Sequence, residues 1–159
     1  MEKIVVNGGK RLEGECSVQG SKNASLHIIG AAMLNSGENV LHMCPMLRDT
    51  TTACEILQLL GCKTSWQDDA LIIDSSGLCN VEISKNLMNQ MRSSIIFLGA
   101  VLARCGEAKV YFPGGCDIGS RPIDLHIDAL KKMGVSVNEC GGQLDCKVNG
   151  KGTKRTCLL

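Results

Sequence analysis

The chain contains one unit of sequence twice. When residues 23–34 are laid over residues 92–103, small and apolar positions coincide along the whole stretch. Residues 53–61 then lie over residues 126–134, and both segments close on a glycine, the residue that commonly ends a helix. Because a repeated sequence places equivalent positions in equivalent surroundings, we expect two similar structural units.

Each copy predicts a helix, a strand, a second helix and a hairpin, from the change between helical and alternating hydrophobic patterns. In the first copy these are helix 22–35, strand 38–43, helix 49–60 and strands 63–66 and 70–74. In the second copy, which a strand at 79–83 precedes, they are helix 86–104, strand 108–112, helix 121–133 and strands 135–139 and 143–148. Two leading strands are expected near 3–7 and 14–18.

The hydrophobic pattern also predicts which elements lie inside. Residues 24–34 and 95–103 are apolar around most of a helical circumference, whereas residues 63–66 and 135–138 alternate. A helix that is apolar all round must be buried, and an alternating strand faces water on one side. We therefore expect an α/β fold with buried helices and outer sheets, the reverse of the usual layered arrangement.

Composition excludes several classes of function. The chain has 159 residues, a net charge of +1 and 3% aromatic residues, so neither a basic face nor a base-stacking surface for nucleic acid is expected. No apolar run reaches the length of about 18 residues that a membrane span needs. The start of the chain has no signal-peptide pattern, which favours the cytoplasm.

The ten cysteines favour buried, reduced thiols over disulfides or metal ligands. No two of them form a C-x-x-C pair. A zinc site built on His42 and Cys44 is the alternative, but it lacks a second ligand pair at metal spacing. We expect no metal and no redox centre.

One cysteine stands in a setting suited to chemistry. Cys116 lies in a glycine-rich loop just before Arg121 and Pro122, where a helix is expected to begin. A guanidinium and free helix amides bind anions and favour the thiolate form of a nearby cysteine. The stretch therefore predicts a reactive thiol beside a phosphate or carboxylate, with a structural salt bridge as the competing role for Arg121.

Two further cations stand at equivalent helix starts. Lys22 and Asn23 follow Gly20, and Arg92 begins a helix that is otherwise almost wholly apolar. Such groups can meet phosphate, although a lone lysine at a helix start is usually a solvated surface residue. Asp49 is interpreted as a helix cap and His27 as a core or boundary residue whose hydrogen bonds are satisfied.

Three motifs in order resemble the UDP-N-acetylglucosamine enolpyruvyl transferases. They are Gly20-Ser21-Lys22-Asn23-Ala24, Met91-Arg92-Ser93-Ser94 and the loop from Pro113 to His126. The resemblance runs from Met1 to about Gly150 and implies an inside-out α/β barrel lobe. It further implies transfer of the enolpyruvyl group of phosphoenolpyruvate to UDP-N-acetylglucosamine in peptidoglycan synthesis, without a cofactor or metal.

The resemblance also implies roles for individual residues. Cys116 would be the general acid and the target of the epoxide antibiotic fosfomycin. The residues implied to bind phosphoenolpyruvate are Lys22, Asn23 and Arg121. Those implied to bind UDP-N-acetylglucosamine are Arg92, Arg121, Pro122, Ile123, Asp124 and Leu125.

Members of the resembled family are much longer and hold their substrates between two lobes. Residues 1–20 would then be leading strands of the other lobe, residues 21–150 a partial substrate-binding lobe, and residues 151–159 a divergent, truncated tail. The catalytic aspartate and further arginines of the second lobe are missing, so little turnover is expected from this chain. A non-catalytic fold relic or binding module, and a separately encoded second lobe as partner, remain open alternatives.

Overall fold

The computed structural model describes residues 3–114 and 122–150 and contains helices and strands in mixed order. The first unit comprises α1 (Lys22–Ala32), β1 (Glu38–Leu41), α2 (Arg48–Leu59), β2 (Lys63–Gln67) and β3 (Ala70–Asp74). The second comprises α3 (Lys85–Gln90), the 3-10 helix η1 (Arg92–Ile95), α4 (Ile96–Cys105), β4 (Glu107–Tyr111), α5 (Asp124–Lys132), β5 (Val135–Cys140) and β6 (Gln143–Val148).

The two units share one topology, which confirms the internal repeat. Each has a three-stranded antiparallel sheet in which the last strand lies in the middle, in the orders β1-β3-β2 and β4-β6-β5. The predicted helix-ending glycines also hold, because Gly61 and Gly134 have φ values of 99° and 89° that favour glycine.

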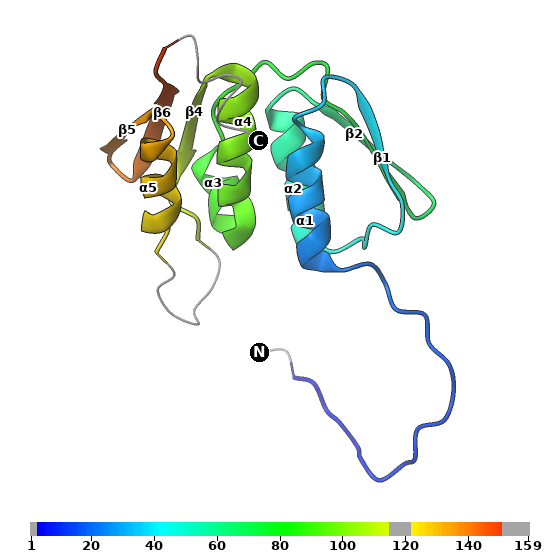
Figure 1. The fold of residues 1–159 in the computed structure, drawn as a ribbon. Helices are drawn as coiled ribbons and strands as arrows, with labels where there is room; N and C mark the ends of the chain where they lie inside the picture. Colours follow the sequence, from blue (N-terminus) through cyan, green and yellow to red (C-terminus); the bar gives the residue numbers. More distant parts are fainter. Residues whose placement is uncertain (1–2, 115–121, 151–159) are drawn as a thin grey trace.

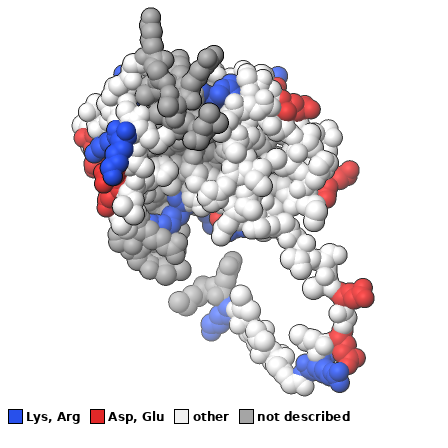
Figure 2. Space-filling view, viewed as in Figure 1, with Lys and Arg blue, Asp and Glu red and all other residues white. Residues whose placement is uncertain are grey.

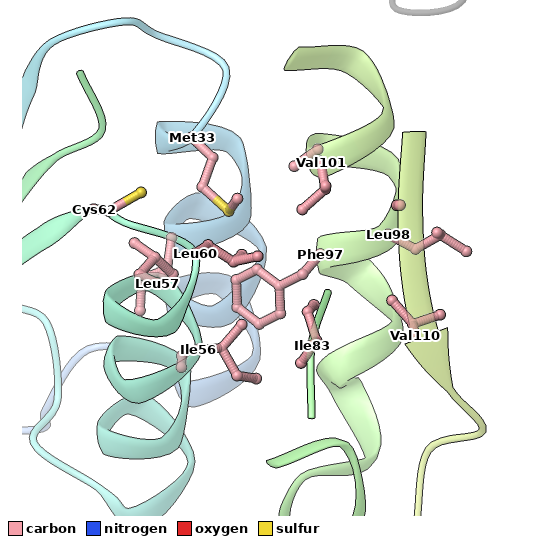
Figure 3. Packing of buried hydrophobic residues seen from close by; sticks show 14 of the residues in the cluster. Met33, Ile56, Leu57, Leu60, Cys62, Ile83, Phe97, Leu98, Val101 and Val110 are labelled. Carbon is pink, nitrogen blue, oxygen red and sulfur yellow. The ribbon is translucent and has the colours of Figure 1, made fainter. Parts of the chain in front are cut away.

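The helices α1, α2 and α4 lie between the two sheets (Figure 1). Their shared core is centred on Phe97 of α4, which is fully buried. Figure 3 shows its ring pointing from α4 toward Ile56 of α2 and toward Leu60, which directly follows α2. Apolar packing of α4 against α1, and of α3 against α2, thus holds the two units together.

A single arginine adds a polar link between the units. The Arg104 guanidinium, in the last turn of α4, donates to the carbonyls of Met33 at 2.6 Å, Asn35 at 3.1 Å and Ser75 at 3.3 Å. Met33 and Asn35 follow the end of α1, where carbonyls lack partners within the helix. Arg104 therefore satisfies three carbonyls of the first unit from the second.

The single helix expected over 86–104 is wrong. Residue Met91 is extended, with φ −138° and ψ 119°, and separates α3 from η1 and α4. The carbonyl of Met88, which would accept from the fourth following amide in a helix, instead accepts from the Ser94 hydroxyl at 3.1 Å and the Gly114 amide at 3.2 Å. Tertiary and side-chain hydrogen bonds have replaced the helical one.

The strands expected at 3–7, 14–18 and 79–83 are not formed either. Residues 3–20 contain no helix or strand, and Ile4 is 94% exposed. A strand requires a neighbour for its hydrogen bonds, and the described part of the chain offers these residues none. In the third segment, only an isolated parallel bridge joins Glu82 to Lys109 of β4.

The expectation of buried helices holds for some helices only. Ile28 of α1 is 50% exposed, although its repeat equivalent, Phe97, is fully buried. The helix expected over 121–133 is described as α5 from Asp124, and none of its residues is buried. In both cases one helix face has no neighbouring unit to cover it within the described residues.

Candidate functional site

Four helices begin at the same end of the molecule. In Figure 1, α1, α2, α4 and α5 all run upward from the lower end, where the segment before α1 also joins the body. Because a helix carries partial positive charge and unpaired amides at its N-terminus, this end favours anions. Among the described residues predicted to bind substrate, Lys22 and Asn23 stand at the start of α1, Arg92 begins η1, which leads into α4, and Pro122 to Leu125 surround the start of α5.

Lys22 is the first residue of α1 and is held by a carboxylate of the next helix. Its Nζ lies 3.0 Å from Oδ2 of Asp49, which is in the first turn of α2. The Ser21 hydroxyl caps α1 by accepting from the Ala24 amide at 3.4 Å. Two neighbouring helix starts thus present an ammonium, its counter-ion and the first amides of α1 together.

Asp49 is not the N-cap that the sequence suggested. The N-cap of α2 is Leu47, whose amide donates to the Thr50 hydroxyl at 2.9 Å. Asp49 stands two residues further on, where its charge still complements the helix dipole. The interpretation of His27 as a core or boundary residue is wrong, because His27 is exposed on α1, although its Nδ1 does have a partner in the Asn23 carbonyl at 2.7 Å.

Gly20 fixes how the chain enters α1. A Cβ atom at this position would lie 2.1 Å from the carbonyl oxygen of Met43, in the loop between β1 and α2. No side chain fits at that separation. The glycine therefore allows the start of α1 to lie directly against the loop that leads into α2.

Arg92 stands at the break between α3 and α4. It is half-buried and begins η1, directly after the extended residue Met91. Gly114 lies beside the same break, since a Cβ on it would lie 2.9 Å from the Asn89 side chain and 3.0 Å from the Asn89 Cα. The start of the glycine-rich loop is therefore anchored next to the helix that leads into Arg92.

The predicted nucleotide-sugar segment begins α5. Ile123 is its N-cap, Asp124 lies in its first turn, and Leu125 is 86% exposed. Ile123 and Asp124 also line a cavity of about 170 Å³ between α5 and the second sheet. Pro122 is exposed.

Cys116 and Arg121 lie outside the described residues. Of the cysteines that the structure describes, all are free thiols, and Cys44, Cys54, Cys62 and Cys146 are buried. Burial raises the pKa of Cys54, Cys62 and Cys146 to about 11. These thiols remain protonated near neutrality, as expected of structural cysteines.

No group of three or more histidines, cysteines or carboxylates that could hold a metal ion occurs within the described ranges. The helices that the structure describes are all too short or too polar to cross a membrane. On the face in Figure 2, outside the grey atoms, basic and acidic side chains are interspersed.

The pairing of Lys22 with Asp49 was missed by sequence reasoning. The two residues are 27 positions apart, and neither has a spacing that predicts the other. The nearest signal was that both stand at predicted helix starts. No sequence pattern indicated that Asn89 would pack against Gly114.

Solved structures define the class of fold. The enolpyruvyl transferase NikO from Streptomyces tendae superposes with a TM-score of 0.76 at 23% identity, covering 89% of this chain and 31% of that one. The EPSP synthase from Acinetobacter baumannii gives a TM-score of 0.63 at 14% identity, covering 89% and 36%. The described body is thus a mixed α/β fold that matches part of the enolpyruvyl transferase fold.

The sequence then gives the family. Residues 6–158 match the model of EPSP synthase (3-phosphoshikimate 1-carboxyvinyltransferase), and the chain belongs to that family. Curated relatives include the UDP-N-acetylglucosamine 1-carboxyvinyltransferase 2 of Caldanaerobacter subterraneus subsp. tengcongensis, 49% identical over 92% of this chain, and the enzyme of Chloroherpeton thalassium, 44% identical over 96%. The chain spans about 35% of their length.

Proposed function

We propose that this chain supplies one wall of an enolpyruvyl transferase site that moves the enolpyruvyl group of phosphoenolpyruvate to UDP-N-acetylglucosamine. The observation that supports this most is the identity of 49% to a carboxyvinyltransferase over 147 residues. The gathering of helix starts at one end supports it from the structure. The body would form part of an inside-out α/β barrel lobe.

In this proposal Lys22 and Asn23 bind the phosphate of phosphoenolpyruvate. An ammonium has three donors, and Asp49 takes one of them at 3.0 Å. The other two donors and the first amides of α1 are suited to a phosphate in front of the helix. Asp49 would then orient Lys22, and Arg121 would add a second cation.

The nucleotide sugar would bind along the second unit. Arg92 would contact it from the start of η1, and Arg121 to Leu125 would contact it from the start of α5. Cys116 would act as the general acid that protonates the methylene carbon while the sugar hydroxyl attacks the neighbouring carbon. The aspartate that takes the hydroxyl proton would come from a second lobe.

We propose that residues 1–20 pair with that second lobe, which would cover the exposed apolar side chains of Ile4, Val5, Val6, Leu12 and Val18. Residues 21–150 would then form the partial lobe, and residues 151–159 a divergent tail. The reduced state of the described cysteines is in keeping with a cytoplasmic location.

Fosfomycin labelling tests the half-site. The intact chain is incubated with fosfomycin, and the adduct is located by peptide mass spectrometry. We expect labelling of Cys116 at least about tenfold faster than of Cys79 and Cys140, because thiolate character sets the rate. Cys79 and Cys140 are matched controls, since both are exposed free thiols. Equal rates at all three would contradict the proposal and favour a relic that has lost its chemistry.

Turnover is tested separately. The purified chain is incubated with phosphoenolpyruvate and UDP-N-acetylglucosamine, and phosphate release is measured. Because loss of the base alone lowers a rate by about 10² to 10⁴, we expect release near the background. Release at the rate of a full-length relative would show that one wall suffices and overturn the need for a second lobe.

A further inference from the structure

A second cavity lies beside the chain segment that enters α1. It has a volume of about 320 Å³, within the range of small-molecule sites. We call it the Trp66 pocket; its walls include Val18, Met43, Met46, Trp66, Asp68 and Asp69. Gly20 of the first motif is among its lining residues, whereas Lys22, Asn23 and Arg92, the described residues proposed to contact phosphate and sugar, are not.

The wall of the pocket is largely apolar. Trp66 is half-buried and packs against the hydrophobic core. Met43 and Met46 are 64% and 63% exposed, and unbranched thioether side chains adapt to ligands of different shape. An apolar body of a ligand would therefore replace water against an aromatic ring and two flexible side chains.

The charge of the pocket is negative. Asp68 and Asp69 form the turn between β2 and β3, and no lysine, arginine or histidine lines the cavity. The ion pairs within residues 3–114 and 122–150 involve other carboxylates, those of Glu13, Asp49 and Glu107. Both turn carboxylates are thus without a salt-bridge partner in that part of the chain.

The backbone around the pocket is unusual at one position. Met43 and Asp68 are the two non-glycine residues with positive φ in the described ranges, at 55° and 52°, and both line the cavity. The two-residue hairpin turn accounts for Asp68. Met43 lies in the turn that follows β1, and non-glycine residues in this conformation are found more often at ligand sites than elsewhere.

We propose that the Trp66 pocket binds a small organic cation with an apolar body, of the arylalkylammonium class. The apolar part would lie against Trp66 and the two methionines, and the ammonium would face the turn carboxylates. A cation near an indole ring gains a further attraction from the negative face of the ring. An anion would meet two uncompensated carboxylates, and a neutral ligand would gain from the apolar wall alone.

Three ligands of nearly equal shape but different charge separate the contribution of the ammonium group from that of the apolar body. The full chain is titrated with benzylammonium, benzyl alcohol and benzoate, and binding is followed by the fluorescence of Trp66, the single tryptophan. We expect benzylammonium to bind about tenfold more tightly than benzyl alcohol and benzoate to bind more weakly than either. Amide resonances of residues 66–70 locate the site. Equal affinities, or shifts confined to other residues, would overturn the proposal.

Variants test the role of the two carboxylates. In D68N/D69N we expect the preference for benzylammonium over benzyl alcohol to fall to about twofold or less. Asparagine tolerates the left-handed conformation of residue 68, so the turn is retained. The control E55Q/E139Q removes the same charge at exposed positions outside the pocket and keeps the preference. An unchanged preference in D68N/D69N, with an unchanged melting temperature, would refute the assignment.

Discussion

Replacement of Arg104 by methionine tests whether the two units depend on one cation. Its guanidinium donates to three carbonyls of the first unit at 2.6 to 3.3 Å. A hydrogen bond from a charged donor contributes about 1.5–3 kcal/mol when buried. Because the sites are only partly buried and water can replace part of this, we expect R104M to lower the free energy of unfolding by about 2–4 kcal/mol. With a urea slope near 2 kcal/mol/M, the unfolding midpoint falls by about 1–2 M.

Two further variants sharpen this test. R104K keeps the charge but not the forked donors, so we expect about half of the loss. R11M makes the same chemical change in the exposed segment, where the side chain of Arg11 is 88% exposed, and we expect no measurable shift. A midpoint for R104M within about 0.3 M of the unsubstituted chain would refute the reasoning, because the three carbonyls would then be satisfied as well by water.

Further predictions concern the core, the chain entry and a buried thiol. We expect F97A to lower the free energy of unfolding by about 3–5 kcal/mol and I28A to lower it by less than about 1 kcal/mol. The two residues are repeat equivalents, but only Phe97 is fully buried. Urea titration measures both changes. G20A should cost about 2 kcal/mol or more, since its Cβ would lie 2.1 Å from a backbone oxygen, whereas G8A meets no atom within 4 Å and should be neutral by the same assay. The raised pKa of Cys146, about 11, keeps its thiol protonated in the fold while the unfolded thiol ionises near pH 8.5. The contribution of this thiol to the free energy of unfolding is therefore full below pH 8 and is lost as the pH rises toward 11. Between these two pH values, we expect the melting temperature of C146V to fall less than that of the unsubstituted chain.

The repeat was the part of the fold that sequence could predict. The helix-ending glycines and the alternating strands are local signals, and the order of helices and strands along each unit follows from them, whereas the strand order within each sheet was not predicted. The break at Met91 was hidden because residues 86–104 carry an unbroken helical pattern. What interrupts the helix is the competition of Ser94 and Gly114 for one carbonyl, and Gly114 comes from a segment distant in sequence.

In the candidate site, too, local features could be predicted from the sequence and tertiary contacts could not. Lys22 could be placed at a helix start, because a capping residue and an apolar run mark such a start locally. The partner of Lys22 could not be found, since Asp49 meets it only after α1 and α2 pack side by side. Exposure was also misjudged, because an apolar stripe such as that of Ile28 indicates burial only where a neighbour is present to cover it.

A titration with phosphoenolpyruvate followed by NMR tests the central claim, that the start of α1 is an anion site. We expect saturable shifts at the amides of Lys22, Asn23 and Ala24 below about 10 mM ligand. Pyruvate, which lacks the phosphate, should shift them much less, and K22A should abolish the response. Shifts that are absent at about 10 mM, or that persist unchanged in K22A, would contradict the account.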